Sequence, residues 1–189
     1  MNYKKITSAV LLALLFITTS ISVGMCQDTS NPSPLKFPTP KGISNQIFYL
    51  QRDPNLNTII YALNADKNGV VNKSEPVVIY WLRYDEGGEK KDLSYIQRKF
   101  AYGLETKSLG NDQYELRFVS HKKIPFYLVK SADDKKYHAY VTVNSKKIEI
   151  ERIFLRIEGG SFWLPNVKYV EIKGVNTAND TAITERIKI

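Results

Sequence analysis

The sequence predicts a mainly β protein: an antiparallel β-sandwich or partly closed barrel with one short amphipathic helix. Apolar and polar residues alternate over most of the chain, β-branched and aromatic residues fill these runs, and only one stretch has helical spacing. Strands therefore outnumber helices by about eight to one, which favours an antiparallel architecture.

The first 26 residues are expected to form a signal peptide. Lys4 and Lys5 precede an apolar run, residues 9–17, that is shorter than the about 20 residues of a membrane-spanning helix. Cleavage after Cys26 fits the small residues there, and the alternative is lipidation of Cys26 as in bacterial lipoproteins. We expect a secreted or periplasmic protein, attached to a membrane only if Cys26 carries lipid.

A linker and one domain are expected to follow. Residues 27–45 are rich in Pro and Ser, as is typical of extended linkers. Residues 46–189 have the length of a single β-rich domain. Cys26 is the only cysteine, so no intramolecular disulfide can form and a hydrophobic core must stabilise the domain.

The positive charge of the chain does not indicate a nucleic-acid partner. After removal of the signal peptide the chain has 25 basic and 19 acidic residues, a net charge of +6. A nucleic-acid-binding protein concentrates such charge on one face, whereas here the excess is dispersed as lysine pairs in expected turns. The pairs are residues 90–91, 122–123, 135–136 and 146–147.

Eight strands are expected, and residues 125–129 are a candidate for one more. The eight are 46–52, 57–64, 75–84, 113–120, 137–144, 147–160, 166–174 and 181–189. Residues 75–84 are apolar at both odd and even positions, which predicts a central strand buried on both faces. Within 147–160 the apolar positions change from even to odd, and a bulge or short turn at Glu151–Arg152 would absorb that change.

Residues 92–104 are the stretch with helical spacing. Asp92 is the expected N-cap, and Gly103 is expected to end the helix in the left-handed conformation. The face expected to pack on the sheet is Leu93, Ile96, Phe100 and Leu104.

The stretch "NADKNGVVNKSE", residues 64–75, matches the ligand positions of an EF-hand calcium loop. Its flanks, however, are strand-like rather than helical, and a proline follows Glu75, which disfavours helical geometry there. A hairpin connection is the favoured interpretation because Asp66, Asn68 and Gly69 are turn residues. A weak calcium site is the alternative.

No catalytic motif occurs in the chain. His121 and His138 are the only histidines, and both are expected to be ordinary surface side chains. Two acidic pairs, Asp85–Glu86 and Asp133–Asp134, could act on glycosides, but adjacent loop acids are typical of turns.

The candidate binding site is a group of aromatic, cationic and amide side chains. Tyr95, Arg98 and Tyr102 are spaced to share one helix face, and such groups can stack on a ligand and donate hydrogen bonds to it. In the competing interpretation the tyrosines pack on the sheet and Arg98 pairs with an acid. The full candidate set is Trp81, Arg83, Tyr84, Tyr95, Gln97, Arg98, Tyr102 and Trp163.

The segments "PVVIYWLRYDEGG", "LSYIQRKFAYG" and "NVKYVEIKG" with "TERI" resemble a family of exported bacterial proteins known as a domain of unknown function, number 4833. The resemblance covers the chain after the linker. It implies no activity, cofactor or catalytic residue.

These observations favour a non-catalytic domain that binds a ligand or partner, with no cofactor and no metal. The partner expected is a small molecule, a glycan or an envelope protein. The alternatives are an envelope enzyme acting on glycans or lipids, and a structural component of an envelope assembly.

Overall fold

One β-sheet contains nearly all the regular structure in the residues that the computed structural model describes, 36–161 and 164–188. The expected signal peptide, residues 27–35 of the expected linker and Trp163 lie outside these residues. The strands are β1 Gln46–Arg52, β2 Asn55–Leu63, β3 Val77–Arg83, β4 Glu89–Asp92, β5 Leu104–Gly110, β6 Gln113–Phe118, β7 His121–Lys130, β8 Tyr137–Val143, β9 Lys146–Gly160, β10 Pro165–Asn176 and β11 Thr181–Lys188. Three short helical turns interrupt them: η1 Tyr84–Glu86, α1 Tyr95–Gln97 and η2 Arg98–Tyr102.

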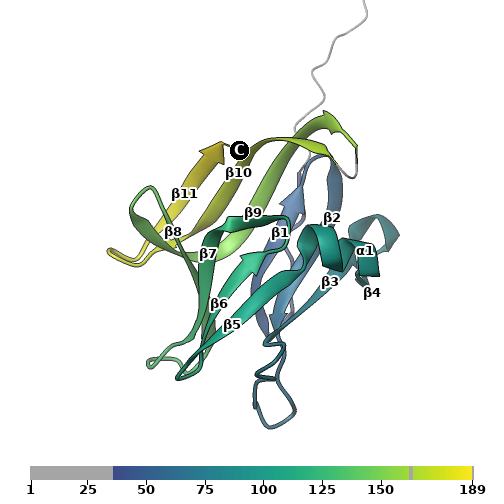
Figure 1. Ribbon diagram of the computed structural model, residues 1–189. Helices are drawn as coiled ribbons and strands as arrows, with labels where there is room; N and C mark the ends of the chain where they lie inside the picture. Colours follow the sequence, from purple (N-terminus) through teal and green to yellow (C-terminus); the bar gives the residue numbers. More distant parts are fainter. Residues whose placement is uncertain (1–35, 162–163, 189) are drawn as a thin grey trace, which may run out of the picture. The chain divides into compact units, whose positions relative to one another are not determined.

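The sheet branches at β9. On one edge β9 pairs first with β8 and then, further along, with β1, while β10 pairs with its other edge. Two arms therefore leave β9: a first arm of β1–β4 and a second arm of β8–β5. Figure 1 shows β1–β3 on one side of β9 and β5–β8 on the other. The pairing of β1 with β9 is parallel and the other strand pairs are antiparallel, so the predicted fold class is confirmed.

The expected irregularity in β9 is a β-bulge. Lys173 of β10 pairs with Arg152, whereas the next residue, Gly174, pairs with Ile150, so Glu151 is the extra residue. Ile150 and Ile153 therefore both belong to the buried core on one face. The change from even to odd apolar positions was a correct signal for this bulge.

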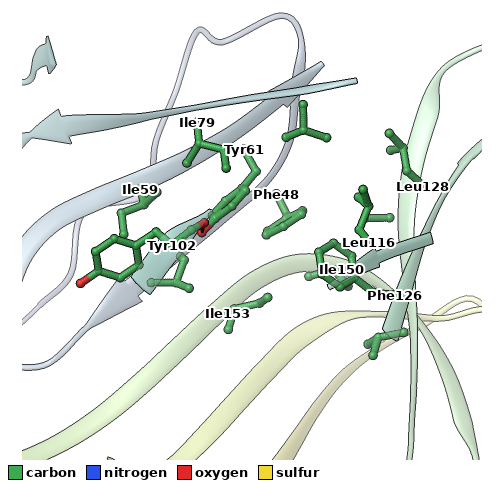
Figure 2. Close-up of a cluster of buried hydrophobic side chains, with 14 of the residues drawn as sticks. Phe48, Ile59, Tyr61, Ile79, Tyr102, Leu116, Phe126, Leu128, Ile150 and Ile153 are labelled. Atoms are coloured by element: carbon green, nitrogen blue, oxygen red, sulfur yellow. Dashed lines mark hydrogen bonds between the residues drawn. The ribbon is translucent and has the colours of Figure 1, made fainter. Parts of the chain in front are cut away.

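The core lies on the concave side of the sheet, between the two arms. Phe48 and Tyr61 of the first arm stack with ring centroids 4.5 Å apart, and Phe126 of the second arm meets Phe48 edge-on at 5.7 Å. Figure 2 shows these rings with Leu116 and Leu128 from the second arm. We call this side the inner face.

The first arm is also covered on its outer face. Tyr80 of β3 packs there with Tyr49 and Ile60, while Val77, Ile79 and Trp81 belong to the inner core. The expected burial of this strand on both faces is thus confirmed. It is also an internal strand, paired with β2 on one side and on the other with β4, the edge strand, whose four residues are all exposed and polar.

The end of the expected linker contacts the outer face. The Phe37 ring lies edge-on to Phe154 at 5.0 Å, and the Gln51 side-chain amide donates to the Pro38 carbonyl at 2.6 Å. Residues 37–43 therefore belong with the sheet, although they form no strand.

The helical segment differs from its prediction at both ends. Its N-cap is Ser94 rather than Asp92. The Ser94 hydroxyl oxygen accepts a hydrogen bond from the backbone N–H of Gln97, and the Gln97 side-chain oxygen accepts one from the backbone N–H of Ser94. After one α turn the chain continues as a π-helix that ends before Gly103. Gly103 has a φ of −65°, so it is not left-handed as predicted; a Cβ there would overlap the Arg98 carbonyl.

The expected apolar face of this helix is half right: Leu93 is buried and Leu104 packs against the core, but Ile96 and Phe100 do not. Ile96 and Phe100 are 43% and 53% exposed, whereas Leu93 and Tyr102 are buried. The i→i+5 hydrogen bonding of a π-helix rotates later residues relative to an α-helix. That rotation turns Tyr102 into the core.

Candidate functional site

A cavity of about 710 Å³ lies on the inner face, next to the core. Both arms line it, together with β9, β10, β11 and η2. Its volume lies within the range of about 300–1,000 Å³ found for small-molecule sites. Most of its lining is apolar, and the buried side chains in it include Leu50, Phe126, Val141, Ile150, Ile153 and Ile172.

The strand pattern explains why this lining is apolar. Inward positions on β9 and β10 alternate with charged residues that face outward, such as Lys173. The bulge at Glu151 keeps Leu155 and Ile153 on the same face as Ile150. An uninterrupted strand would have turned half of these side chains outward.

Polar groups contribute to the lining around the end of β1. Arg52 ends β1, Asp53 lies in the turn that follows and Asn55 begins β2, while Ser120 and His121 lie where the chain passes from β6 to β7. The Asp53 carboxylate is ion-paired with Arg156.

Arg52 lies between aromatic rings instead of beside an acid. Its guanidinium carbon is 5.6 Å from the centroid of Trp81 and 5.5 Å from that of Tyr102. Its Nε is buried without a hydrogen-bond acceptor among the described residues. Arg52 is therefore a cation held in place by aromatic contacts.

Tyr102 forms the wall between the cavity and the first arm. The Tyr61 hydroxyl donates to the Tyr102 carbonyl at 2.9 Å, and the Tyr102 ring lies edge-on to Trp81 at 5.5 Å. Burial raises the pKa of the Tyr102 phenol, and the positive charge of Arg52 acts in the opposite direction.

Of the predicted site residues, Tyr102 lines the cavity and Trp81 lies one contact further away, through Arg52. The Trp81 indole donates to the Gln97 side-chain oxygen at 3.2 Å, so Gln97 serves both the helix cap and the tryptophan. Trp163 lies outside the described residues.

The other predicted side chains lie away from the cavity. Tyr95 is 71% exposed and does not share a face with Tyr102, so that part of the prediction is wrong. Arg98 pairs with Glu75 at 3.5 Å, as the competing interpretation expected. Arg83 pairs with Glu86 at 2.7 Å, and burial raises the pKa of the half-buried Tyr84.

Arg52 was missed by the sequence-based prediction, although the sequence contains a signal for it. Phe48 and Leu50 are the preceding inward positions of β1, and Arg52 continues their alternation. An arginine at an inward position of an apolar strand is unusual and would have identified this residue.

The segment 64–75 is a connection between β2 and β3, as the hairpin interpretation predicted. Asp66 Oδ1 accepts from the backbone amides of Asn68 and Val70 at 2.9 Å. Gly69 has a φ of +78°. Asp66 Oδ1, which would be a ligand in the alternative calcium site, thus accepts hydrogen bonds that stabilise the turn.

The candidate catalytic groups are engaged in local contacts. Asp85 accepts a hydrogen bond from Asn57 at 2.9 Å and lies 3.6 Å from Arg83. His138 bridges Glu149 at 2.6 Å and Asp134 at 3.0 Å on the outer face. The described residues contain no cluster of three or more acidic, histidine or cysteine side chains suited to a metal ion.

The fold and the cavity define a class: a mainly β domain whose branched sheet lines a half-open, mostly apolar cavity that has an arginine in its lining. No helix in the described part of the chain is long and apolar enough to cross a membrane. The chain belongs to the family described as Domain of unknown function (DUF4833), whose model matches residues 48–186. Searches of the curated proteins and of the solved structures each found no match.

Proposed function

We propose that the chain is a secreted or periplasmic domain that binds a ligand without chemical conversion, and that the ligand is a small, largely apolar molecule held in the inner cavity. The observation that carries this proposal is the cavity itself, about 710 Å³ of mainly apolar lining. Apolar surface binds apolar ligands because burial removes both from water.

The lining supports a small apolar ligand over a glycan. A glycan presents many hydroxyl groups, each of which costs free energy when buried without a partner. The lining has few polar side chains, and its charged ones, Arg52 and Asp53, are adjacent at the end of β1, so they suit one polar end of a ligand.

Binding of a neutral fluorescent probe, N-phenyl-1-naphthylamine, tests the proposal. The native protein should bind it saturably with increased fluorescence. Val170→Trp places a large ring in the cavity, since Val170 lines it and is only partly buried. We expect this substitution to weaken probe binding at least tenfold, on the order of 1.4 kcal/mol.

The matched control is Thr142→Trp, which adds the same ring at an exposed position of β8 outside the cavity lining. It should bind the probe like the native protein. Circular dichroism verifies folding, and Val167→Trp replaces Val170→Trp if the latter does not fold. Equal probe affinity in native protein and folded cavity variants would contradict the proposal.

A further inference from the structure

The side chain of Arg52 is directed into the cavity by the geometry of β1. Arg52 is the last residue of the strand and follows Phe48 and Leu50 on the inner face. The strand then turns through Asp53 and Pro54, whose side chains also line the cavity. A permanent positive charge is thereby placed in the wall of an otherwise apolar site.

Arg52 differs from the other arginines because its side chain has no carboxylate as an ion-pair partner. Each of the other six lies within 4.0 Å of a carboxylate oxygen: Arg83, Arg98, Arg117, Arg152, Arg156 and Arg186. The Arg52 side chain has no ion pair or hydrogen bond with the described residues. The buried Nε–H of Arg52 has no acceptor among the described residues, and burying such a donor costs the protein alone free energy.

The acid that follows Arg52 in the sequence does not form an ion pair with it. Asp53 is adjacent in sequence, but its carboxylate is paired with Arg156. The contacts of Arg52 with Trp81 and Tyr102 orient the guanidinium through the ring faces. A ring face attracts the cation without accepting hydrogen bonds in the guanidinium plane, so those donors stay directed at an incoming acceptor.

We infer that the ligand is a single-chain amphiphile with an anionic head, and that Arg52 binds the carboxylate or phosphate of that head while the apolar tail occupies the cavity. This inference rests on the proposed function and identifies its ligand class. A planar guanidinium donates two parallel hydrogen bonds to such an oxyanion. The head then supplies the partner that Arg52 lacks, and the tail covers the aliphatic lining of β9 and β10.

The test measures displacement of N-phenyl-1-naphthylamine by compounds that share one twelve-carbon chain. Dodecanoate, dodecyl phosphate, dodecanol and dodecyltrimethylammonium are compared below their micelle concentrations. In the native protein at least one anion should bind about tenfold or more tightly than the alcohol, and the cation should bind most weakly. Comparison of dodecanoate with dodecyl phosphate identifies the preferred head. Lengthening the chain should strengthen binding by about fourfold per methylene until the cavity is full.

The decisive variant is Arg52→Gln. It should remove the preference for anions and leave affinities for the probe and for dodecanol within about twofold of native values. Arg186→Gln is the matched control, because Arg186 also lies over a tyrosine ring but pairs with Glu171 and does not line the cavity. It should keep the anion preference.

The outcomes separate the two proposals. If the probe and dodecanol bind but the native protein does not prefer an anion, the inference about Arg52 is wrong and the cavity proposal stands. If Arg52→Gln lowers binding of every compound equally, Arg52 has a structural role and the inference is likewise wrong. If nothing binds the native protein, both fail. If Arg52→Gln does not fold, Arg52→Lys is measured instead. It keeps the charge, so it should keep an anion preference that is weaker than that of the native protein. An Arg52→Lys protein with no anion preference would overturn the inference.

Discussion

Gly174 lies where two neighbouring backbones of the sheet come unusually close. It pairs with Ile150 beside the bulge, and a Cβ at this position would overlap the Glu149 carbonyl. We predict that Gly174→Ala lowers the free energy of unfolding by about 1–3 kcal/mol, because a β strand cannot move away without breaking its pairing. Urea unfolding followed by circular dichroism measures the change.

The neighbouring substitution Lys173→Ala is the control for this prediction. Lys173 is exposed and its pair with Glu151 spans 3.5 Å at the surface, so its loss should change the free energy of unfolding by no more than about 0.5 kcal/mol. A Gly174→Ala protein as stable as Lys173→Ala would show that the sheet can widen at the bulge.

Single residues also show how much of the site could be predicted. The candidate set from the sequence includes Tyr102 and Trp81; the structure places Tyr102 in the cavity lining and Trp81 one contact away, through Arg52. The sequence did not indicate Arg52 as their partner, because Arg52 and Tyr102 are 50 positions apart and meet only when the helical segment closes on the first arm. Spacing along one helix cannot predict a contact of that kind.

Among the elements, the helical segment departs furthest from its prediction. Asp92 and Ser94 are both good N-cap residues, and the choice between them is made by β4, whose pairing with β3 includes Asp92. Because Asp92 is held in a strand, the helix begins after Ser94. The π-helical turns that follow have no clear signature in the sequence.

The cap can be tested by two substitutions. Ser94→Ala removes the hydroxyl that accepts from the Gln97 amide, so the free energy of unfolding should fall by about 1 kcal/mol. Asp92→Ala should change it by less than about 0.5 kcal/mol, because Asp92 is exposed and caps nothing in the structure. Chemical denaturation of both variants checks this difference, and the reverse order of effects would favour the original prediction.

Buried tyrosines affect the stability of the whole molecule at high pH. Burial is the main reason why eight tyrosines in the described part of the chain have a pKa above the ordinary value of 10.0, and it raises the pKa of Tyr137 to about 12. The other seven are Tyr49, Tyr61, Tyr80, Tyr84, Tyr102, Tyr114 and Tyr140.

The sign of the pH effect follows from this direction. A phenol with a higher pKa in the folded chain keeps its proton when the unfolded chain has lost it, so the unfolded state binds fewer protons. We therefore predict that the free energy of unfolding falls as pH rises above about 10 and continues to fall towards about 12. Urea unfolding across this range, with phenolate absorbance recorded in parallel, measures it.

Tyr137→Phe should make the fall less steep, because one titrating phenol is removed. The prediction would be contradicted if the phenols of the folded protein ionised at their ordinary pKa and the free energy of unfolding stayed constant over this pH range.

The sequence by itself determined the fold class, the bulge in β9 and the strand character of residues 75–84, because side-chain alternation is a local property of a strand. Only the tertiary structure decided that β9 joins both arms and encloses a cavity. This arrangement brings together residues such as Asp53 and Arg156, which are 103 positions apart and form an ion pair, and it leaves Arg52 facing the cavity without an acid. Which distant strands become neighbours depends on the packing of the whole core, and no local pattern contains that information.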